Sequence, residues 1–138
     1  MTNGDLAVAV LDTSALLALV REESGATRVE GAVRRGALIS TVNWAEALSR
    51  LAAGGEGVDV SAPRVRRKVA KLGTLSLVVF DEAQAEQAAR LRVPTRSLGL
   101  SLADRVCLAL GRLHRLPVLT TDRAWRSLHL SITIDVIR

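Results

Sequence analysis

The sequence is poor in the residues that several common kinds of functional site require. Its 138 residues include one cysteine, two histidines, one phenylalanine, two tryptophans and no tyrosine. The single cysteine, Cys107, cannot form an internal disulfide, which fits a reducing cytoplasm. Two isolated histidines are too few for a zinc site or a Ser-His-Asp triad. So few aromatic rings disfavour a base-stacking platform, and any contact with nucleic acid is expected to be mainly with phosphates.

Long hydrophobic runs and clustered lysines are also missing. No segment reaches the ~18 uninterrupted apolar residues of a membrane span, and the N-terminus lacks the basic start of a secretory signal. The length, with 49% hydrophobic and 24% charged residues, predicts a single globular domain over residues 1–138. The formal charge of +5 comes from nineteen basic residues, of which two are lysines. This balance favours a polyanionic partner such as nucleic acid, and arginines that are simply solvated fit it equally well.

Apolar runs alternate with amphipathic helical patterns along the chain. Residues 7–11 form an unalternating apolar run that leads through Asp12 into a helix, as expected of a strand buried on both faces of a parallel sheet. Further strands are predicted at 38–40, 75–80, 117–121 and 131–137, and helices at 26–35, 41–53, 64–72, 82–92 and 101–115. We expect Thr41 or Asn43 to cap the helix at 41–53, and Pro63 to stand in the first turn of the next helix. The alternation predicts a three-layer α/β/α fold with a central parallel sheet of four to five strands.

Three aspartates stand where a predicted strand meets a helix, namely Asp12, Asp81 and Asp122. This is the edge of a parallel sheet at which ligands bind. Aspartate is also a favoured helix N-cap, and for each of the three taken alone capping is the simpler interpretation. Asp81 forms a pattern like a capping box with Gln84, so we assign it a structural role.

Asp104 also has two interpretations. Together with Ser101 it fits a capping box. The helix that follows is apolar nearly all round, and one of its faces carries Leu102, Val106, Leu110 and Leu113. This pattern predicts a buried helix with a single acidic group, and a buried carboxylate needs a charged partner or a metal ion.

Glu46 lies off the apolar stripe of its helix, and Arg50 offers it an ion pair at i,i+4. Taken with Asp12, Asp104 and Asp122, it completes a second hypothesis. Carboxylates that converge from separate elements raise one another's pKa unless a cation compensates. Oxygen ligands suit Mg²⁺ or Mn²⁺, which bind phosphates and can activate water against a phosphodiester. Such a site in an otherwise basic chain is suited to cutting nucleic acid.

Other protein classes that begin with an aspartate or use a glycine-rich loop are disfavoured. A haloacid-dehalogenase-type phosphatase needs a second aspartate where this chain has Ser14. A receiver domain needs a lysine at the end of a late strand, whereas Lys68 and Lys71 lie on a predicted helix. The glycines at 54–57 neither follow a strand nor precede the Lys-Ser/Thr pair of a phosphate-binding loop.

Four segments resemble the acidic motifs of PIN-domain ribonucleases. They are residues 10–19 with Asp12, 41–46 with Glu46, 100–105 with Asp104, and 119–125 with Asp122. Their order, spacing and total length are similar to those of the VapC-type toxins of bacterial toxin–antitoxin modules, and the resemblance covers nearly the whole chain. One departure is Ala124, where many relatives carry another acid, which puts a second tightly held metal ion in doubt.

The resemblance implies a Mg²⁺- or Mn²⁺-dependent endoribonuclease with Asp12, Glu46, Asp104 and Asp122 as catalytic and metal-binding acids. It also implies residues that orient these acids or bound water, namely Thr13, Ser14, Asn43 and Thr121. An antitoxin partner and a homodimer follow from the same resemblance. Contacts with RNA are predicted for one basic helix, through Arg64, Arg66, Arg67, Lys68 and Lys71. A non-catalytic RNA- or partner-binding module of this fold, and an RNA-processing PIN nuclease without an antitoxin, remain as alternatives.

Overall fold

The fold is built on a five-stranded parallel sheet with the strand order β3-β2-β1-β4-β5. It was obtained as a computed structural model, which describes residues 6–138. The strands are β1 (Ala9–Leu11), β2 (Ala37–Ser40), β3 (Leu75–Val78), β4 (Val118–Thr120) and β5 (Ile134–Val136). Each strand is parallel to its neighbours, which confirms the predicted parallel sheet.

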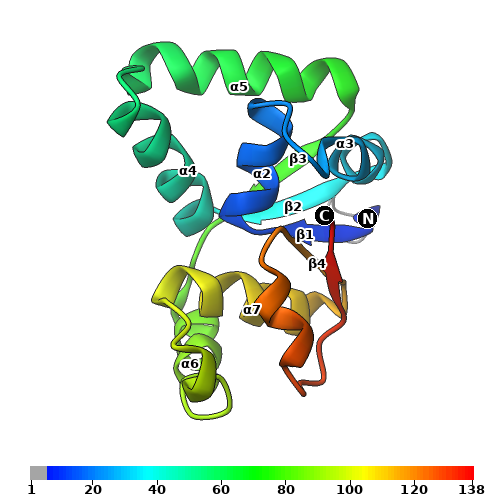
Figure 1. The fold of residues 1–138 in the computed structure, drawn as a ribbon, viewed down its shortest axis with the longest axis vertical. Helices are drawn as coiled ribbons and strands as arrows, with labels where there is room; N and C mark the ends of the chain where they lie inside the picture. Colours follow the sequence, from blue (N-terminus) through cyan, green and yellow to red (C-terminus); the bar gives the residue numbers. More distant parts are fainter. Residues whose placement is uncertain (1–5) are drawn as a thin grey trace.

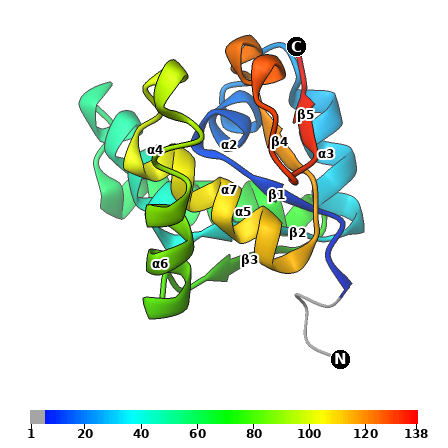
Figure 2. The same cartoon turned by 90° about the horizontal axis from the view of Figure 1, so that it is seen from below.

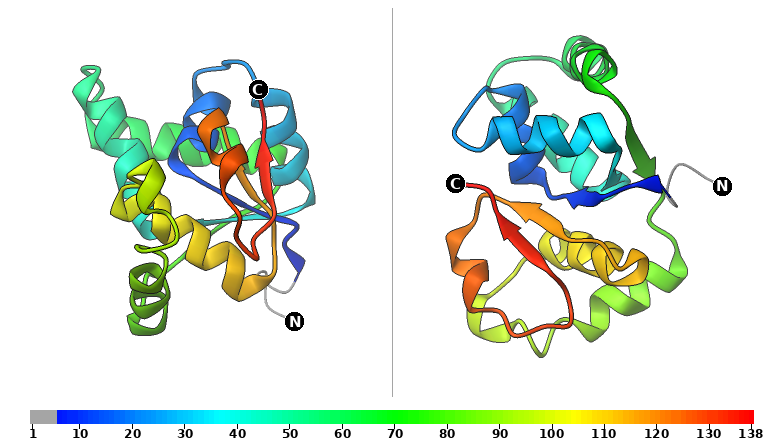
Figure 3. Two further views of the ribbon diagram at one scale, coloured as in Figure 1. Left: turned by 60° about the horizontal axis from the view of Figure 1, so that its bottom comes forward. Right: turned by 90° about the vertical axis from the view of Figure 1, so that its right-hand side faces the viewer.

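Helices cover both faces of this sheet (Figure 1). One layer contains α2 (Thr13–Val20), α3 (Ala26–Arg35), α4 (Thr41–Ala53) and α5 (Val58–Leu72). The opposite layer contains α6 (Glu82–Arg90) and α7 (Leu102–His114), which pack on each other. Figure 2 shows α7 crossing the face of the sheet, and the right-hand view of Figure 3 shows the strands between the two helical layers. The predicted three-layer α/β/α architecture is confirmed.

Side chains of the central strands alternate between two hydrophobic cores. Leu11 and Ile39 belong to the core beneath α2 to α5, whereas Val10 and Leu38 belong to the core beneath α7. All residues of β1, β2 and β4 are buried. This burial on both faces explains why the sequence shows unbroken apolar runs at these positions.

Two predicted helix starts are wrong. Ser40 caps α4, because its hydroxyl accepts the amide hydrogen of Val42, so neither Thr41 nor Asn43 is the cap. Helix α5 begins at Val58, which places Pro63 inside the helix rather than in its first turn. Proline lacks an N–H group, so Pro63 removes one backbone hydrogen bond from α5. Burial of Ala62, three residues before Val65, extends the apolar stripe of the helix toward its N-terminus and offsets this loss.

Short helical turns complete the chain, with 3-10 segments at Arg96–Leu98 and Arg123–Ser127. The second one follows β4 and carries Trp125 into the core of α7. Within residues 6–138, every helix is too short or too polar to cross a membrane.

Candidate functional site

All four predicted acids line one pocket of about 480 Å³ at the carboxyl ends of the strands. It lies where the first turns of α2 and α7, the middle of α4 and the segment after β4 approach one another (Figure 1). The complete lining consists of Asp12, Thr13, Ser14, Glu46, Arg50, Ser101, Asp104, Thr121, Asp122, Trp125 and Arg138. Side chains up to 126 residues apart in the sequence therefore share one cavity, as expected for a parallel sheet.

Asp12 is the buried carboxylate of this pocket, with 4% of its surface exposed. It caps α2, and its Oδ1 atom accepts hydrogen bonds from the Ser14 hydroxyl and the Ala15 amide, both at 2.7 Å. Burial raises the pKa of Asp12 to about 6. Hydrogen bonds from Thr120, Ser14 and Ala15 act against this rise, and the nearby charge of Asp104 adds to it.

Asp104 is only half-buried and occupies a complete capping box. Its Oδ2 accepts the Ser101 amide at 3.0 Å, and its own amide donates to the Ser101 hydroxyl at 3.1 Å. Leu102 and Leu113 are 56% and 46% exposed, because only the middle of α7 lies inside the core. The prediction of an isolated buried carboxylate is therefore wrong for Asp104, and the description fits Asp12.

Asp122 and Glu46 complete the pocket from its exposed side. Asp122 caps the 3-10 segment after β4, with Oδ1 accepting the Ala124 amide at 2.9 Å. Glu46 accepts a hydrogen bond from Arg50 at 2.7 Å through Oε1, which confirms the predicted i,i+4 ion pair. Glu46 belongs both to this ion pair and to the pocket.

In three of the four acids, one carboxylate oxygen is held and the other is available. Glu46, Asp104 and Asp122 each use a single oxygen in the bonds above, and no donor within residues 6–138 reaches the second oxygen. No three His, Cys, Asp or Glu side chains of the described chain are already gathered as ligands of a single ion. Mg²⁺ typically takes one or two protein carboxylates and completes its shell with water and phosphate. The donor set and the space in the pocket fit such an ion.

The predicted supporting residues connect the elements that carry the acids. The Asn43 amide group donates to the Thr13 hydroxyl and to the Ala103 carbonyl, both at 3.1 Å, and so ties α4 to α2 and α7. The Thr121 amide donates to the Ser14 hydroxyl at 3.0 Å. Thr13, Ser14 and Thr121 line the pocket, whereas Asn43 is fully buried behind it.

The basic helix α5 lies away from the pocket, on the outer side of its layer (Figure 1). Arg64 binds Glu56 through two hydrogen bonds of 2.7 and 2.8 Å, and Lys68 pairs with Glu22 at 3.0 Å. The Arg66 guanidinium lies over the Trp44 ring, with its Cζ atom 5.4 Å from the ring centroid. None of the five residues predicted to contact RNA lines the pocket of the four acids.

Five residues at or beside the pocket were not predicted as site residues, namely Arg50, Ser101, Thr120, Trp125 and Arg138. Thr120 stabilises the charged form of Asp12, and its place at the end of a strand was the available signal. Trp125 and Arg138 line the pocket, but nothing in their local sequence indicates this.

The PIN domain family model matches residues 9–129 of the sequence. This chain belongs to the PIN domain family. The resemblance inferred from the four acidic motifs is confirmed at this level. Among curated proteins, none matches the sequence.

Several solved structures share the fold of this PIN domain. FitAcB from Neisseria gonorrhoeae has a TM-score of 0.69 at 20% identity, covering 92% of this chain and 96% of that chain. VapBC2 from Rickettsia felis, bound to a promoter DNA fragment, has a TM-score of 0.68 at 12% identity, with coverage of 93% and 97%. VapBC-5 from Mycobacterium tuberculosis, a member of the VapBC family of toxin–antitoxin systems, has a TM-score of 0.53 at 24% identity, with coverage of 96% and 98%.

Proposed function

We propose that this PIN domain is a Mg²⁺- or Mn²⁺-dependent endoribonuclease that acts as the toxin of a toxin–antitoxin pair. The observation that supports it most is the convergence of Asp12, Glu46, Asp104 and Asp122 on one pocket of a basic protein. A carboxylate is buried there with a raised pKa, which is the environment that a bound cation would stabilise.

In this proposal some residues of the pocket would bind the metal ion, and others would hold the elements that carry these ligands in place. When bound, a divalent ion lowers the pKa of water and offsets the charge of a phosphodiester. Asp12 offers charge at the bottom of the pocket, and Asp104 and Asp122 offer their second oxygens from its sides. Ser14, Thr13, Asn43 and Thr121 would restrict the positions of these elements through the bonds described above.

Arg50 gives the pocket a positive group beside Glu46. Glu46 would help to hold the ion through its second oxygen, while Arg50 keeps the first oxygen in place. Arg50 also lines the pocket, where its other N–H groups would donate to an RNA phosphate.

A cleavage assay on labelled RNA tests this function. We expect cleavage with Mg²⁺ or Mn²⁺, no cleavage with EDTA, and a loss of at least about 100-fold in Asp12→Asn and Asp104→Asn. Asp81→Asn is the matched control, because Asp81 caps α6 through the Gln84 amide in the same way but lies outside the pocket. Undiminished cleavage in both pocket variants would contradict the site. RNA binding without any cleavage would favour the non-catalytic module of the same fold.

The toxin role rests on the likeness to VapBC and FitAB chains, and it needs a test in cells. Induced expression should arrest growth, and Asp12→Asn should abolish the arrest. Co-expression of a small DNA-binding protein encoded beside this gene should restore growth. Cleavage in vitro without growth arrest would instead favour an RNA-processing PIN nuclease that has no antitoxin. The predicted homodimer is tested by the mass of the purified protein in solution.

A further inference from the structure

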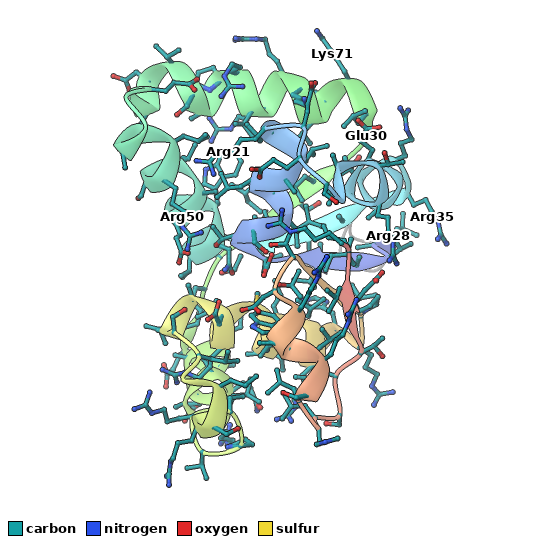
Figure 4. The ribbon with its side chains drawn as sticks, viewed as in Figure 1. Arg21, Arg28, Glu30, Arg35, Arg50 and Lys71 are labelled. Atoms are coloured by element: carbon teal, nitrogen blue, oxygen red, sulfur yellow. The ribbon has the colours of Figure 1, made fainter. Side chains whose placement is uncertain are left out.

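The amino-terminal edge of the sheet, opposite the pocket of the four acids, is bordered by arginines. A hollow of about 320 Å³ lined by Arg28 and Arg35 runs from the start of β1 across β4 to Asp135 of β5, and one of about 140 Å³ beside the starts of β2 and β3 is lined by Arg34 and Arg35. A third hollow, of about 170 Å³, adjoins the loops that enter β4 and β5 and is lined by Arg112 and Arg115. Figure 4 shows Arg28 and Arg35 extending from α3 on the side where β1 begins. We call these five arginines the basic edge.

Most of the positive charge of the basic edge is not neutralised. Among residues 6–138, the one acid that lines the three hollows is Asp135, and it is paired with Arg28. Within the described part of the chain, Arg34, Arg35, Arg112 and Arg115 take part in no ion pair. These four therefore carry charge that an external anion can bind.

Helix ends alone do not account for so many cations. The C-terminus of a helix carries about half a negative charge, which one cation offsets. Helix α3 ends with two arginines, and α7 ends with Arg112 and His114 before its cap, Arg115. Each helix therefore brings at least one positive charge more than its own end requires.

The lining of these hollows favours phosphates over bases. No aromatic side chain of the described residues lines any of the three hollows, so these residues offer no surface for base stacking. Guanidinium groups bind phosphate oxygens through paired hydrogen bonds. The rise from Val8 to Asp12 is about 13 Å at ~3.3 Å per residue, so an RNA strand that passes over the surface must span at least this distance to reach both edges of the sheet.

We propose that the basic edge binds the phosphate backbone of the RNA substrate and holds it while another part of the strand enters the pocket of the four acids. This inference rests on the proposed ribonuclease function. It places the main RNA contacts on α3 and α7, whereas the sequence analysis predicted them on α5, where three of the five residues have partners within the protein.

Binding of a fluorescein-labelled single-stranded RNA in EDTA, followed by fluorescence anisotropy, tests the proposal without hydrolysis. The edge variants are Arg34→Gln/Arg35→Gln and Arg115→Asn, the latter because Arg115 has a φ of +55°, which asparagine tolerates. The matched control is Arg67→Gln/Lys71→Gln on α5, which also removes two positive charges. Thermal unfolding of each variant verifies that the fold is retained.

Each lost phosphate contact should reduce the slope of log affinity against log salt by about 0.7 and the affinity at ~0.1 M salt by roughly fivefold. The double edge variant should thus bind about 25-fold more weakly, Arg115→Asn roughly fivefold more weakly, and the α5 variant within about twofold of the wild type. Equal losses in the edge and α5 variants, or no loss in the edge variants, would overturn the proposal. Tighter binding of duplex DNA than of RNA through the same arginines would also overturn it.

Failure of the ribonuclease function gives a different result. If the wild type binds RNA through the basic edge but does not cleave it with Mg²⁺ or Mn²⁺, the binding surface stands and the nuclease is refuted. If the wild type cleaves RNA and the edge variants bind as tightly as it does, the nuclease stands and the basic edge is refuted.

Discussion

Replacement of Asp12 by asparagine should stabilise the metal-free protein at neutral pH. The side chain is 4% exposed, and burial raises its pKa to about 6. Asparagine caps helices as well as aspartate does, and its carbonyl oxygen can accept the same bonds from Ser14 and Ala15. The substitution therefore removes the buried charge and retains the hydrogen bonds that fix the start of α2.

The size of the effect follows from the pKa of Asp12 in the folded and unfolded chain. A rise from 3.8 to about 6 corresponds to about 3 kcal/mol, at 1.36 kcal/mol per pKa unit. Because the pKa is higher in the folded state, the fold favours the protonated form. The wild type therefore has no penalty below pH 3.8, a penalty that grows between pH 3.8 and 6, and the full penalty above pH 6. Asp12→Asn should remove up to about 3 kcal/mol of this penalty at about pH 7.5 and almost none near pH 4.

Urea unfolding in EDTA at several pH values measures this difference. Added Mg²⁺ should stabilise the wild type more than Asp12→Asn, because the cation offsets a charge that the variant lacks. Asp81→Asn, an exposed cap of the same kind, should change the free energy of unfolding by less than about 0.5 kcal/mol at every pH. A variant at position 12 that is less stable than the wild type at pH 7.5, or a difference that does not change with pH, would refute the reasoning.

Four further predictions concern stability and reactivity. Asp104→Ala should lower the free energy of unfolding by about 1 kcal/mol, since it breaks the capping box, whereas Asp104→Asn should have a smaller effect; urea unfolding compares them. Cys107 should not react with a thiol reagent until urea unfolds the protein, because the side chain is completely buried and its pKa is raised well above the usual range. Gly31→Ala should raise the free energy of unfolding by up to about 1 kcal/mol, because alanine favours the helical conformation and its Cβ would clash with nothing within 4 Å; thermal unfolding measures this. Gly73→Ala should be destabilised by about 1–3 kcal/mol, as its Cβ would lie 2.3 Å from the Val33 carbonyl oxygen.

The order of strands and helices could be predicted because it follows from local patterns. The apolar run at 7–11 reflects burial of β1 on both faces, and Asp81 and Ser101 cap helices as their neighbours in the sequence indicate. The start of α4 could not be predicted, because Ser40 and Thr41 are both good caps and the path of the backbone decides between them. The early start of α5 depends on burial of Ala62 against other helices, which no local pattern contains.

Asp12 and Asp122 could be predicted because they follow strands, and Asp104 because it fits a capping box, whereas Glu46 joined the set through the resemblance to the PIN motifs. Which of them is buried could not be predicted, since the burial of Asp12 depends on how α2 and its neighbours cover the end of β1. The basic edge could not be predicted from the sequence for a related reason. Its arginines lie between positions 28 and 115, and only the folding of five strands brings them to one edge. The density of basic residues on α5, by contrast, is evident in any short window of sequence.

Three of the four acids also serve as helix caps or as part of a capping box, so the same side chains that line the pocket stabilise the helices around it. Because bonds within the chain hold these carboxylates at the helix starts, the pocket should form without a bound cation. Substitutions that inactivate the pocket are also unequal in their effect on the cell. Asparagine at Asp12 would leave a folded, inactive chain that still presents its surfaces to partners, whereas alanine at the same position would lose the cap as well as the charge. If the protein is toxic, a selection for harmless variants that also requires a folded chain should therefore enrich asparagine over alanine at position 12.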